Sequence, residues 1–271
     1  MSREFLVDSH CHVQNLRPEE RDAALDDARR RGVGGFLLPA VRLSDAEEVL
    51  AFCHRHPDVW CALGVHPHEA SSWQSGDQKR LASLLEDPRA VAVGECGLDF
   101  YYDHAPRDVQ ERALAEQWQL AIDLGLPAVV HNRDSNLAML EMVRRPEFAR
   151  LQADFHSFAG GLEMGRELLV RGFYLGLSGM ITFPRADNVR EVIPELPRER
   201  ALVETDTPYL APIPYRGKPN RPAYVVEVAE RLAQEQGETF AAVAAQTTEN
   251  FFRLFSKAAR PAIRALAAAE A

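Results

Sequence analysis

Two kinds of segment alternate along the chain. Short apolar runs rich in Val, Leu and Ala predict strands, and longer segments with apolar residues every three or four positions predict helices. Arg107–Leu124 is typical of the second kind, because its apolar residues fall on one helix face. The predicted strands end near Ser9, Pro39, Val65, Glu95, His131, His156, Gly176 and Thr205. The predicted helices span Pro18–Arg31, Asp45–Arg55, Gln78–Glu86, Arg107–Leu124, Ser135–Arg145, Gly161–Arg171, Asn188–Glu195, Pro222–Gln236, Thr239–Ala244 and Thr248–Ala259.

This alternation predicts an α/β protein with a parallel sheet, because parallel strands need crossover helices between them. Eight such units in 271 residues fit a single-domain (β/α)₈ TIM barrel. A doubly wound open sheet is the alternative. No linker or repeat divides the chain, so we predict that the barrel spans residues 1–260 and is followed by an Ala-rich tail at 261–271.

Composition favours a globular protein of the cell interior. Hydrophobic residues make up 46% and charged residues 26%, which is ordinary for a folded domain. The apolar run at 34–41 is too short to cross a bilayer, and Asp8 and His10 interrupt any apolar signal segment. We therefore expect a cytoplasmic protein with no membrane partner and no obligate protein partner.

The four cysteines do not predict a metal site. Cys11, Cys53, Cys61 and Cys96 form no C-x-x-C pair, so we expect free thiols. Cys11 and Cys96 stand beside candidate ligands, and strand alternation predicts that they point away from them.

The formal charge of −9 argues against broad, nonspecific coating of nucleic acid. A nucleic-acid substrate remains compatible with it, because bound metal ions can supply positive charge locally.

Six residues with side chains that bind metals stand at predicted strand ends. They are His10, His12, Glu95, His131, His156 and Asp206. The first two alternate around Cys11, so on a strand they face the same side. In a barrel the carboxyl ends of all strands meet at one mouth, where active sites are built. We therefore predict that the six side chains converge there.

The chemistry of these side chains limits the choice of metal. Imidazole nitrogens and carboxylate oxygens without sulfur suit Zn²⁺, Mn²⁺, Co²⁺ or Mg²⁺. Six ligands are too many for one tetrahedral ion with an open position, but they suffice for two ions if one carboxylate bridges. A pair of ions can activate water and stabilise a leaving oxygen, which favours metal-assisted hydrolysis.

The chain resembles the TatD family of metal-dependent deoxyribonucleases, within the amidohydrolase-like barrels, from residue 5 to about 255. The matching segments are Val-Asp-Ser-His-Cys-His (7–12), Gly-Val-His-Pro-His (64–68), Gly-Glu-Cys-Gly-Leu-Asp-Phe-Tyr-Tyr (94–102), Val-His-Asn-Arg (130–133), His-Ser-Phe-Ala-Gly (156–160), Glu-Thr-Asp-Thr-Pro-Tyr-Leu (204–210) and Arg-Gly-Lys-Pro-Asn (216–220). Val13-Gln14 stands where many relatives carry Leu-Asp, and Ala159 replaces a more usual Thr or Ser. We expect neither departure to touch a ligand.

The resemblance also implies a role for each ligand. His10, His12 and Asp206 would hold one divalent ion, His131 and His156 a second, and Glu95 would bridge the two. Asp206 would in addition act as general base toward the attacking water.

Other polar residues near the predicted mouth have more than one interpretation. His66 is a candidate catalytic residue that contacts substrate phosphate or supports a ligand. His68 has either such a role or a structural one. Arg133 either binds a phosphodiester or pairs with Asp134. Arg216 and Lys218 are candidate substrate-binding residues, because loops after the last barrel strands often bind phosphate.

A few side chains are expected to support the site or lie outside it. Asp99 could orient a ligand histidine. Tyr101, Tyr102 and Tyr209 either stack on bases or pack within the protein. His54, His56 and His104 are expected to be surface residues.

Three hypotheses about function follow. The first is hydrolysis of phosphodiester bonds in DNA, as a single-strand exonuclease, where DNA as the substrate rests on the resemblance alone. The second is hydrolysis of an amide, a lactone or a small phosphodiester at the same site. The third is a metal-stabilised binding protein, which an open site for two metal ions argues against.

Overall fold

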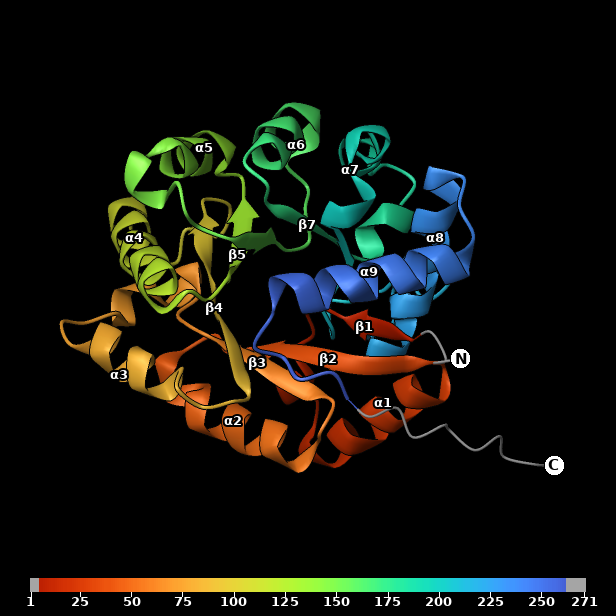
Figure 1. Cartoon of the computed structure of the whole chain (residues 1–271), viewed down its shortest axis with the longest axis horizontal. Helices are drawn as coiled ribbons and strands as arrows, with labels where there is room; N and C mark the ends of the chain where they lie inside the picture. Colours follow the sequence, from red (N-terminus) through yellow and green to blue (C-terminus); the bar gives the residue numbers. More distant parts are fainter. Residues whose placement is uncertain (1–4, 262–271) are drawn as a thin grey trace.

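The computed structural model describes residues 5–261 and is built around one sheet of eight parallel strands. The strands pair with one another in chain order, from β1 to β8. They are β1 (Leu6–Asp8), β2 (Val33–Pro39), β3 (Val59–Leu63), β4 (Ala90–Asp99), β5 (Ala128–Arg133), β6 (Ala153–Phe155), β7 (Tyr174–Leu177) and β8 (Ala201–Val203). Figure 1 shows these strands in the middle of the molecule with helices around them.

The sheet closes where β8 meets β1. The backbone N–H of Ser9 donates to the carbonyl of Val203 at 3.1 Å. The Asp8 carboxylate strengthens this seam, because it accepts hydrogen bonds from the backbone N–H of Thr205 at 2.8 Å and from its hydroxyl at 2.7 Å. The predicted single-domain (β/α)₈ barrel is therefore confirmed, and the open doubly wound sheet is excluded.

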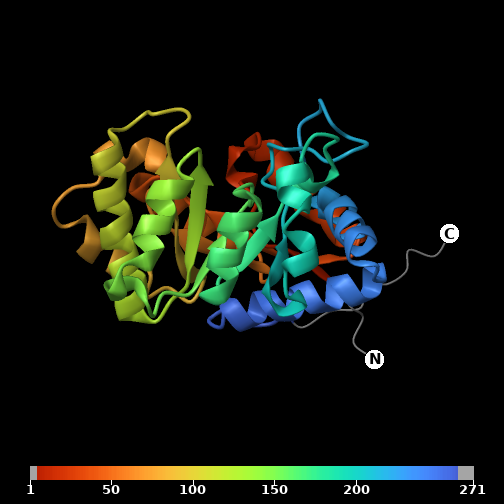
Figure 2. The same ribbon diagram turned by 90° about the horizontal axis from the view of Figure 1, so that it is seen from above.

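Helices follow the strands in alternation and cover the outside of the barrel (Figure 1). They are α1 (Pro18–Arg30), α2 (Ala46–Arg55), α3 (Asp77–Leu84), α4 (Arg107–Leu124), α5 (Asn136–Arg144), α6 (Gly161–Val170), α7 (Asp187–Arg190), α8 (Val225–Gln236) and α9 (Phe240–Leu254). Figure 2 shows α9 along one edge of the molecule and the long loops after β4 and β8 at the opposite edge.

Helix α9 covers the end of the barrel at which the strands begin. The Asn250 side-chain amide donates to the carbonyl of Ala201, the first residue of β8, at 2.8 Å. The Thr248 hydroxyl donates to the carbonyl of Phe5, just before β1, at 2.6 Å. Trp60 of β3 packs against the Phe251 ring with 5.6 Å between centroids. These contacts bury aromatic surface under the barrel and leave its other end free for a site.

Two helix predictions were wrong. The segments predicted as Thr239–Ala244 and Thr248–Ala259 form the single helix α9, which ends at Leu254. Thr247 does not interrupt it, because its hydroxyl donates to the carbonyl of Val243 one turn earlier at 2.9 Å.

The helix predicted at Asn188–Glu195 is shorter than expected. It is reduced to α7 and a separate 3₁₀ turn at Ile193–Glu195. Pro194 lacks an N–H and disfavours the α conformation in the residue before it, so the helix cannot continue through this point.

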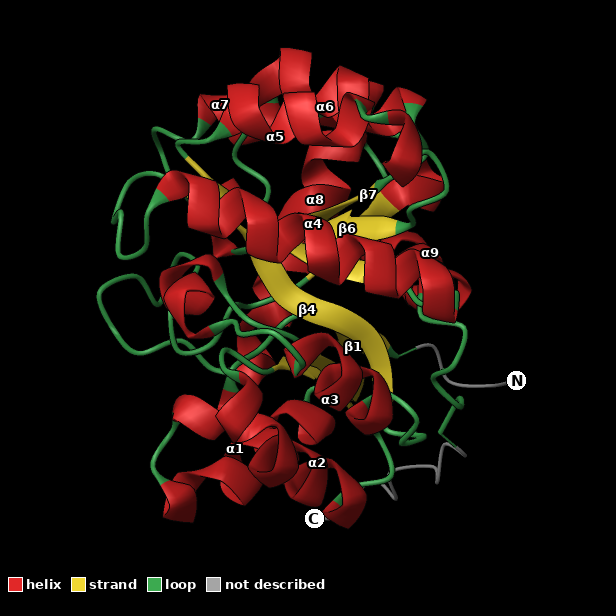
Figure 3. Cartoon of the chain, turned by 90° about the vertical axis from the view of Figure 1, so that its left-hand side faces the viewer, coloured by secondary structure: helices red, strands yellow, loops and turns green. Residues whose placement is uncertain are grey.

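Strand β4 is longer than predicted and curves through the molecule (Figure 3). It continues past Glu95 because Gly97, Leu98 and Asp99 pair with β5. The third strand conversely ends two residues before the predicted Val65, at Leu63. The remaining strand ends agree with the pattern to within a few residues.

Gly97 permits the close approach of β4 and β5. Its φ is 156°, and a Cβ atom built there would lie 1.9 Å from the carbonyl oxygen of His131. A side chain at this position therefore cannot coexist with the observed pairing.

The structure also bears on the thiols and on membrane insertion. All four cysteines are free and buried, and the Cys11 and Cys96 side chains lie in the hydrophobic core. Between residues 5 and 261, no helix is both long and apolar enough to span a bilayer. The predicted Ala-rich tail, except for residue 261, lies outside the described residues.

Gly97→Ala is expected to destabilise the fold by more than about 4 kcal/mol, or to prevent folding, because the clash is with backbone. The matched control is Gly125→Ala: its φ is 64° and no atom lies within 4 Å of the added Cβ. The control should lose only about 1–2 kcal/mol from left-handed strain. Urea unfolding followed by circular dichroism measures both, and similar losses would contradict the steric argument.

Candidate metal centre

The first group of metal-binding side chains gathers just beyond the ends of β1 and β8 and at the middle of β4. The Nε2 atoms of His10 and His12 are 3.1 Å apart, and each lies 3.4 Å from Oε2 of Glu95. Oδ1 of Asp206 completes the first group, at 3.9 Å from His10 Nε2 and 3.6 Å from His12 Nε2. As predicted, His10 and His12 therefore face the same side of the chain, on either side of Cys11 in the sequence.

The second group surrounds the other oxygen of the same glutamate. Oε1 of Glu95 lies 2.8 Å from His156 Nε2 and 3.1 Å from His131 Nδ1. His66 Nε2 also faces it at 3.4 Å. His66 was predicted as a substrate contact or a support for a ligand, and this remains a prediction. Its ring nitrogen also lies among the side chains that could hold an ion.

The two groups fit divalent metal ions. Ligand atoms about 2.1 Å from one ion lie roughly 3.0–3.4 Å apart at octahedral to tetrahedral angles. The observed separations range from 2.8 to 3.9 Å. Glu95 is 1% exposed, and its Oε2 has no hydrogen-bond partner among the described residues although it is buried. A cation would satisfy this oxygen, and the donor set of imidazoles and carboxylates suits the ions predicted from the sequence.

The protonation states of the side chains in the site favour the binding of a divalent cation. Burial alone would raise the pKa of Glu95, but the nearby imidazoles of His156, His66 and His10 outweigh it and hold this pKa well below its usual value. Burial lowers the pKa of His66 to about 4, so this ring is neutral at neutral pH and has a lone pair to share. Burial raises the pKa of Asp206 to about 6.

Asp99 supports the second group, as the sequence predicted. Its Oδ2 accepts hydrogen bonds from His131 Nε2 at 3.0 Å and from His68 Nε2 at 2.9 Å. His131 therefore turns its Nδ1 toward Glu95. Burial opposes ionisation of Asp99, but the hydrogen bonds from His131, Tyr102 and His68 together outweigh it and lower the pKa of the carboxyl. A carboxylate of this kind fixes the orientation of an imidazole ligand and increases its basicity.

Glu204 is a site residue to which the sequence analysis gave no role. Its Oε1 accepts the backbone N–H of Ser157 at 2.8 Å and lies 3.3 Å from His156 Nδ1, so it orients that ring. Its place beside Asp206 in the sequence is not a sufficient signal, because β8 ends at Val203 and Asp206 has a φ of 58°, so strand alternation does not apply to these residues. Glu204 and the neighbouring Asp154 are fully buried, and burial raises the pKa of Asp154 well above its usual value.

Gln14 corrects one expectation. It was expected to touch no ligand, yet its Nε2 lies 3.4 Å from His12 Nδ1 and donates to the carbonyl of Pro39 at 2.6 Å. Gln14, where the sequence departs from the family pattern, therefore contacts the candidate ligand His12 directly.

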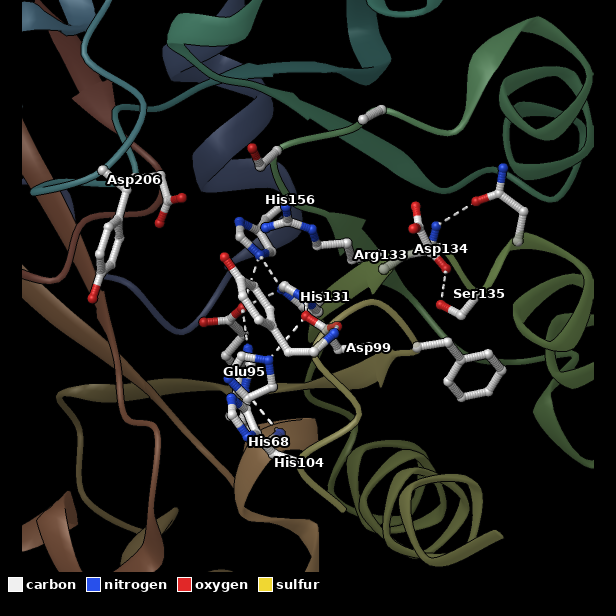
Figure 4. Close-up of a pocket in the computed structure, with 18 of the residues that line it drawn as sticks. His68, Glu95, Asp99, His104, His131, Arg133, Asp134, Ser135, His156 and Asp206 are labelled. Atoms are coloured by element: carbon white, nitrogen blue, oxygen red, sulfur yellow. Dashed lines mark hydrogen bonds and ion pairs between the residues drawn. The ribbon is translucent and has the colours of Figure 1, made fainter. Parts of the chain in front are cut away.

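A pocket of about 1260 Å³ lies over both groups, and Figure 4 shows Glu95, His131, His156 and Asp206 around a common space. Arg133, among the predicted substrate-binding residues, lines this pocket.

Arg216 and Lys218 are absent from the pocket lining found within residues 5–261, and the Arg216 guanidinium lies over the Phe183 ring at 4.4 Å. His104 is exposed as predicted but also lines the pocket.

A (β/α)₈ barrel with such a donor set at the carboxyl ends of its strands defines the class of protein as a metal-dependent hydrolase. The family model described as TatD related DNase matches residues 7–256. The chain belongs to the TatD family.

Individual relatives agree with this assignment. The chain is 34% identical over 260 residues to a Bacillus subtilis protein named uncharacterized metal-dependent hydrolase YabD, covering 93% of this chain and 99% of the relative. It is 37% identical over 249 residues to a Cronobacter sakazakii protein named 3'-5' ssDNA/RNA exonuclease TatD, covering 90% and 94%. The crystal structure of the TatD homolog YJJV from Escherichia coli K12 superposes with a TM-score of 0.87 at 31% identity, covering 94% and 99%.

Asp99→Asn is expected to weaken the affinity for divalent metal by about 10–100-fold, because His131 loses its anionic hydrogen-bond acceptor. Titration with Zn²⁺ or Mn²⁺ in competition with a chelator measures this. Asp103→Asn is the matched control, since Asp103 lies in the loop that follows Asp99 and β4 and is exposed. If Asp99→Asn binds metal as tightly as the wild type does, the supporting role of Asp99 is wrong.

Removal of metal is expected to lower the thermal midpoint. An ion held at about 100 times its Kd stabilises the fold by about 2.7 kcal/mol, which corresponds to roughly 5–10 °C in a chain of this length. Calorimetry of chelator-treated protein with and without added Zn²⁺ or Mn²⁺ measures the shift. Glu95→Ala should greatly reduce the shift. An unchanged midpoint in the wild type would show that the two groups do not hold metal.

Proposed function

We propose that the protein hydrolyses phosphodiester bonds in single-stranded DNA from one end of the strand, using two divalent ions among Zn²⁺, Mn²⁺, Mg²⁺ and Co²⁺. The position of Glu95 carries the proposal, because its Oε2 faces the first group and its Oε1 faces the second. One buried carboxylate shared in this way suits two adjacent ions better than one. The name of the Cronobacter sakazakii relative supports a nucleic-acid substrate and cleavage from the 3' end.

Different residues of the site would bind the ions, orient the ligands and accept a proton. When bound, divalent ions neutralise charge on a phosphoryl oxygen and acidify water. His10, His12, His131, His156 and Glu95 would supply the ligand atoms, and His66 Nε2 faces the same carboxylate. Asp99 and Glu204 fix the ring orientations of His131 and His156. Asp206, a member of the first group, lines the pocket and accepts the proton of the attacking water.

Substrate recognition in this proposal is local. Arg133 lines the pocket and is exposed, so its guanidinium can pair with a phosphate. Arg216 and Lys218 lie farther along the loop after β8, where they can contact only a more distant part of the strand. A chain with a formal charge of −9 gains little from nonspecific attraction to DNA. A cytoplasmic location remains a prediction, and so does the absence of an obligate protein partner.

The proposal predicts stepwise shortening of an end-labelled single-stranded oligonucleotide in Mg²⁺, Mn²⁺, Co²⁺ or Zn²⁺, and loss of this activity with a chelator. Glu95→Ala should lower the rate by at least about a thousandfold, and Asp206→Asn, which keeps the size of the side chain, by about a hundredfold or more. Glu47→Ala is the control, because the Glu47 side chain is 77% exposed on α2.

Product length on a denaturing gel gives the result. If no oligonucleotide is shortened while metal is bound, the nuclease proposal fails. Turnover of an amide, a lactone or a small phosphodiester would then identify the protein as a different hydrolase with the same site.

A further inference from the structure

A cluster of planar side chains lies at the edge of the pocket, beside the second group. Tyr101 and Tyr102 follow β4 and are 57% and 50% exposed. His104 stands in the same loop and Arg133 ends β5. These two residues and Tyr102 line the pocket, whereas Tyr101 is not among the lining residues and lies against Arg133. We call these four residues the tyrosine platform. Two half-exposed phenol rings at the edge of a candidate active site are unusual for residues that merely pack the fold.

The rings of the platform support one another. The Arg133 guanidinium lies 4.2 Å from the centroid of Tyr101 and 4.7 Å from that of Tyr102. Tyr102 and His104 are parallel to within 4°, with 5.8 Å between their centroids. The platform therefore combines flat aromatic surface with a positive charge at the entrance of the site.

Asp99 joins the platform to the candidate metal centre. Its Oδ1 accepts the backbone N–H groups of Tyr101 at 3.0 Å and Tyr102 at 2.9 Å. Its Oδ2 holds His131, a member of the second group, at 3.0 Å. Figure 4 shows Asp99 close to His131, with His104 and Arg133 on different sides of this pair. One buried carboxylate thus fixes the platform relative to the second group.

We propose that the tyrosine platform binds the nucleobase of a nucleotide adjacent to the phosphodiester that is cleaved. This inference rests on the proposed nuclease function. Nucleobases stack on exposed aromatic rings and on guanidinium planes whatever their sequence, which suits an enzyme that degrades strands of any sequence. An acidic protein gains little affinity from contacts with distant phosphates, so stacking beside the site supplies the affinity and sets the position of the strand.

The test compares an intact oligonucleotide with one that carries an abasic nucleotide at one of its last positions. The wild type is expected to cleave the intact strand with a kcat/KM about tenfold higher than that for the strand whose abasic nucleotide occupies the platform. Tyr102→Leu and Tyr101→Leu should remove most of this preference, mainly through KM, and leave cleavage of the abasic strand almost unchanged. Tyr102→Phe keeps the ring and should restore the preference.

Phe240→Leu is the matched control, because Phe240 is a 40% exposed aromatic residue at the start of α9, away from the platform. It should leave the preference intact. Thermal midpoints of all variants show whether they are folded. A structural role for the tyrosines would lower cleavage of intact and abasic strands alike.

Three outcomes overturn the proposal. The wild type could cleave intact and abasic strands equally at every position, the leucine variants could slow both strands by the same factor, or Tyr102→Phe could behave like Tyr102→Leu. In each case shortening of the strand still supports the nuclease function. If the wild type shortens no strand in any metal, the nuclease function and the platform proposal both fail.

Discussion

The site depends on the burial of one negative charge. The Glu95 carboxylate lies inside the barrel at 1% exposure, where an isolated ion would be very costly. Imidazoles from β1, β3, β5 and β6 or from the loops that follow them surround it, and together they keep it ionised. Since these strands lie next to one another only in the closed barrel, the charge depends on the barrel for its partners.

The closure of the barrel between β8 and β1 brings together the side chains of the first group around Glu95. Asp8, at the end of β1, binds both polar hydrogens that Thr205 presents, and this contact places Asp206 opposite His10 and His12. A barrel that was open at this seam would still have most of its hydrophobic core. It would lack the first group, because the members of that group come from the two strands that meet there and from β4.

The sequence predicted the parts of the molecule that depend on repeating patterns and on strand ends. It identified eight strands and the convergence of residues as distant as His10 and Asp206, because barrel geometry brings the carboxyl ends of parallel strands together. It did not predict the role of Glu204 or the contact of Gln14 with His12, because these depend on side-chain directions. It divided α9 between Ala244 and Thr248, and the hydrogen bond from the Thr247 hydroxyl to Val243 that lies in this gap cannot be read from the sequence pattern.

The position of α9 bears on the order in which the molecule can be completed during synthesis. This helix covers Trp60 and binds backbone groups beside β1 and β8, yet its residues leave the ribosome last among the helices of the described chain. Until they emerge, Trp60 at the end of the barrel where the strands begin is exposed to water. Strands β1 and β8 then also lack the hydrogen bonds from Thr248 and Asn250. A nascent chain that stalls before residue 240 therefore keeps an apolar surface of the kind that chaperones bind.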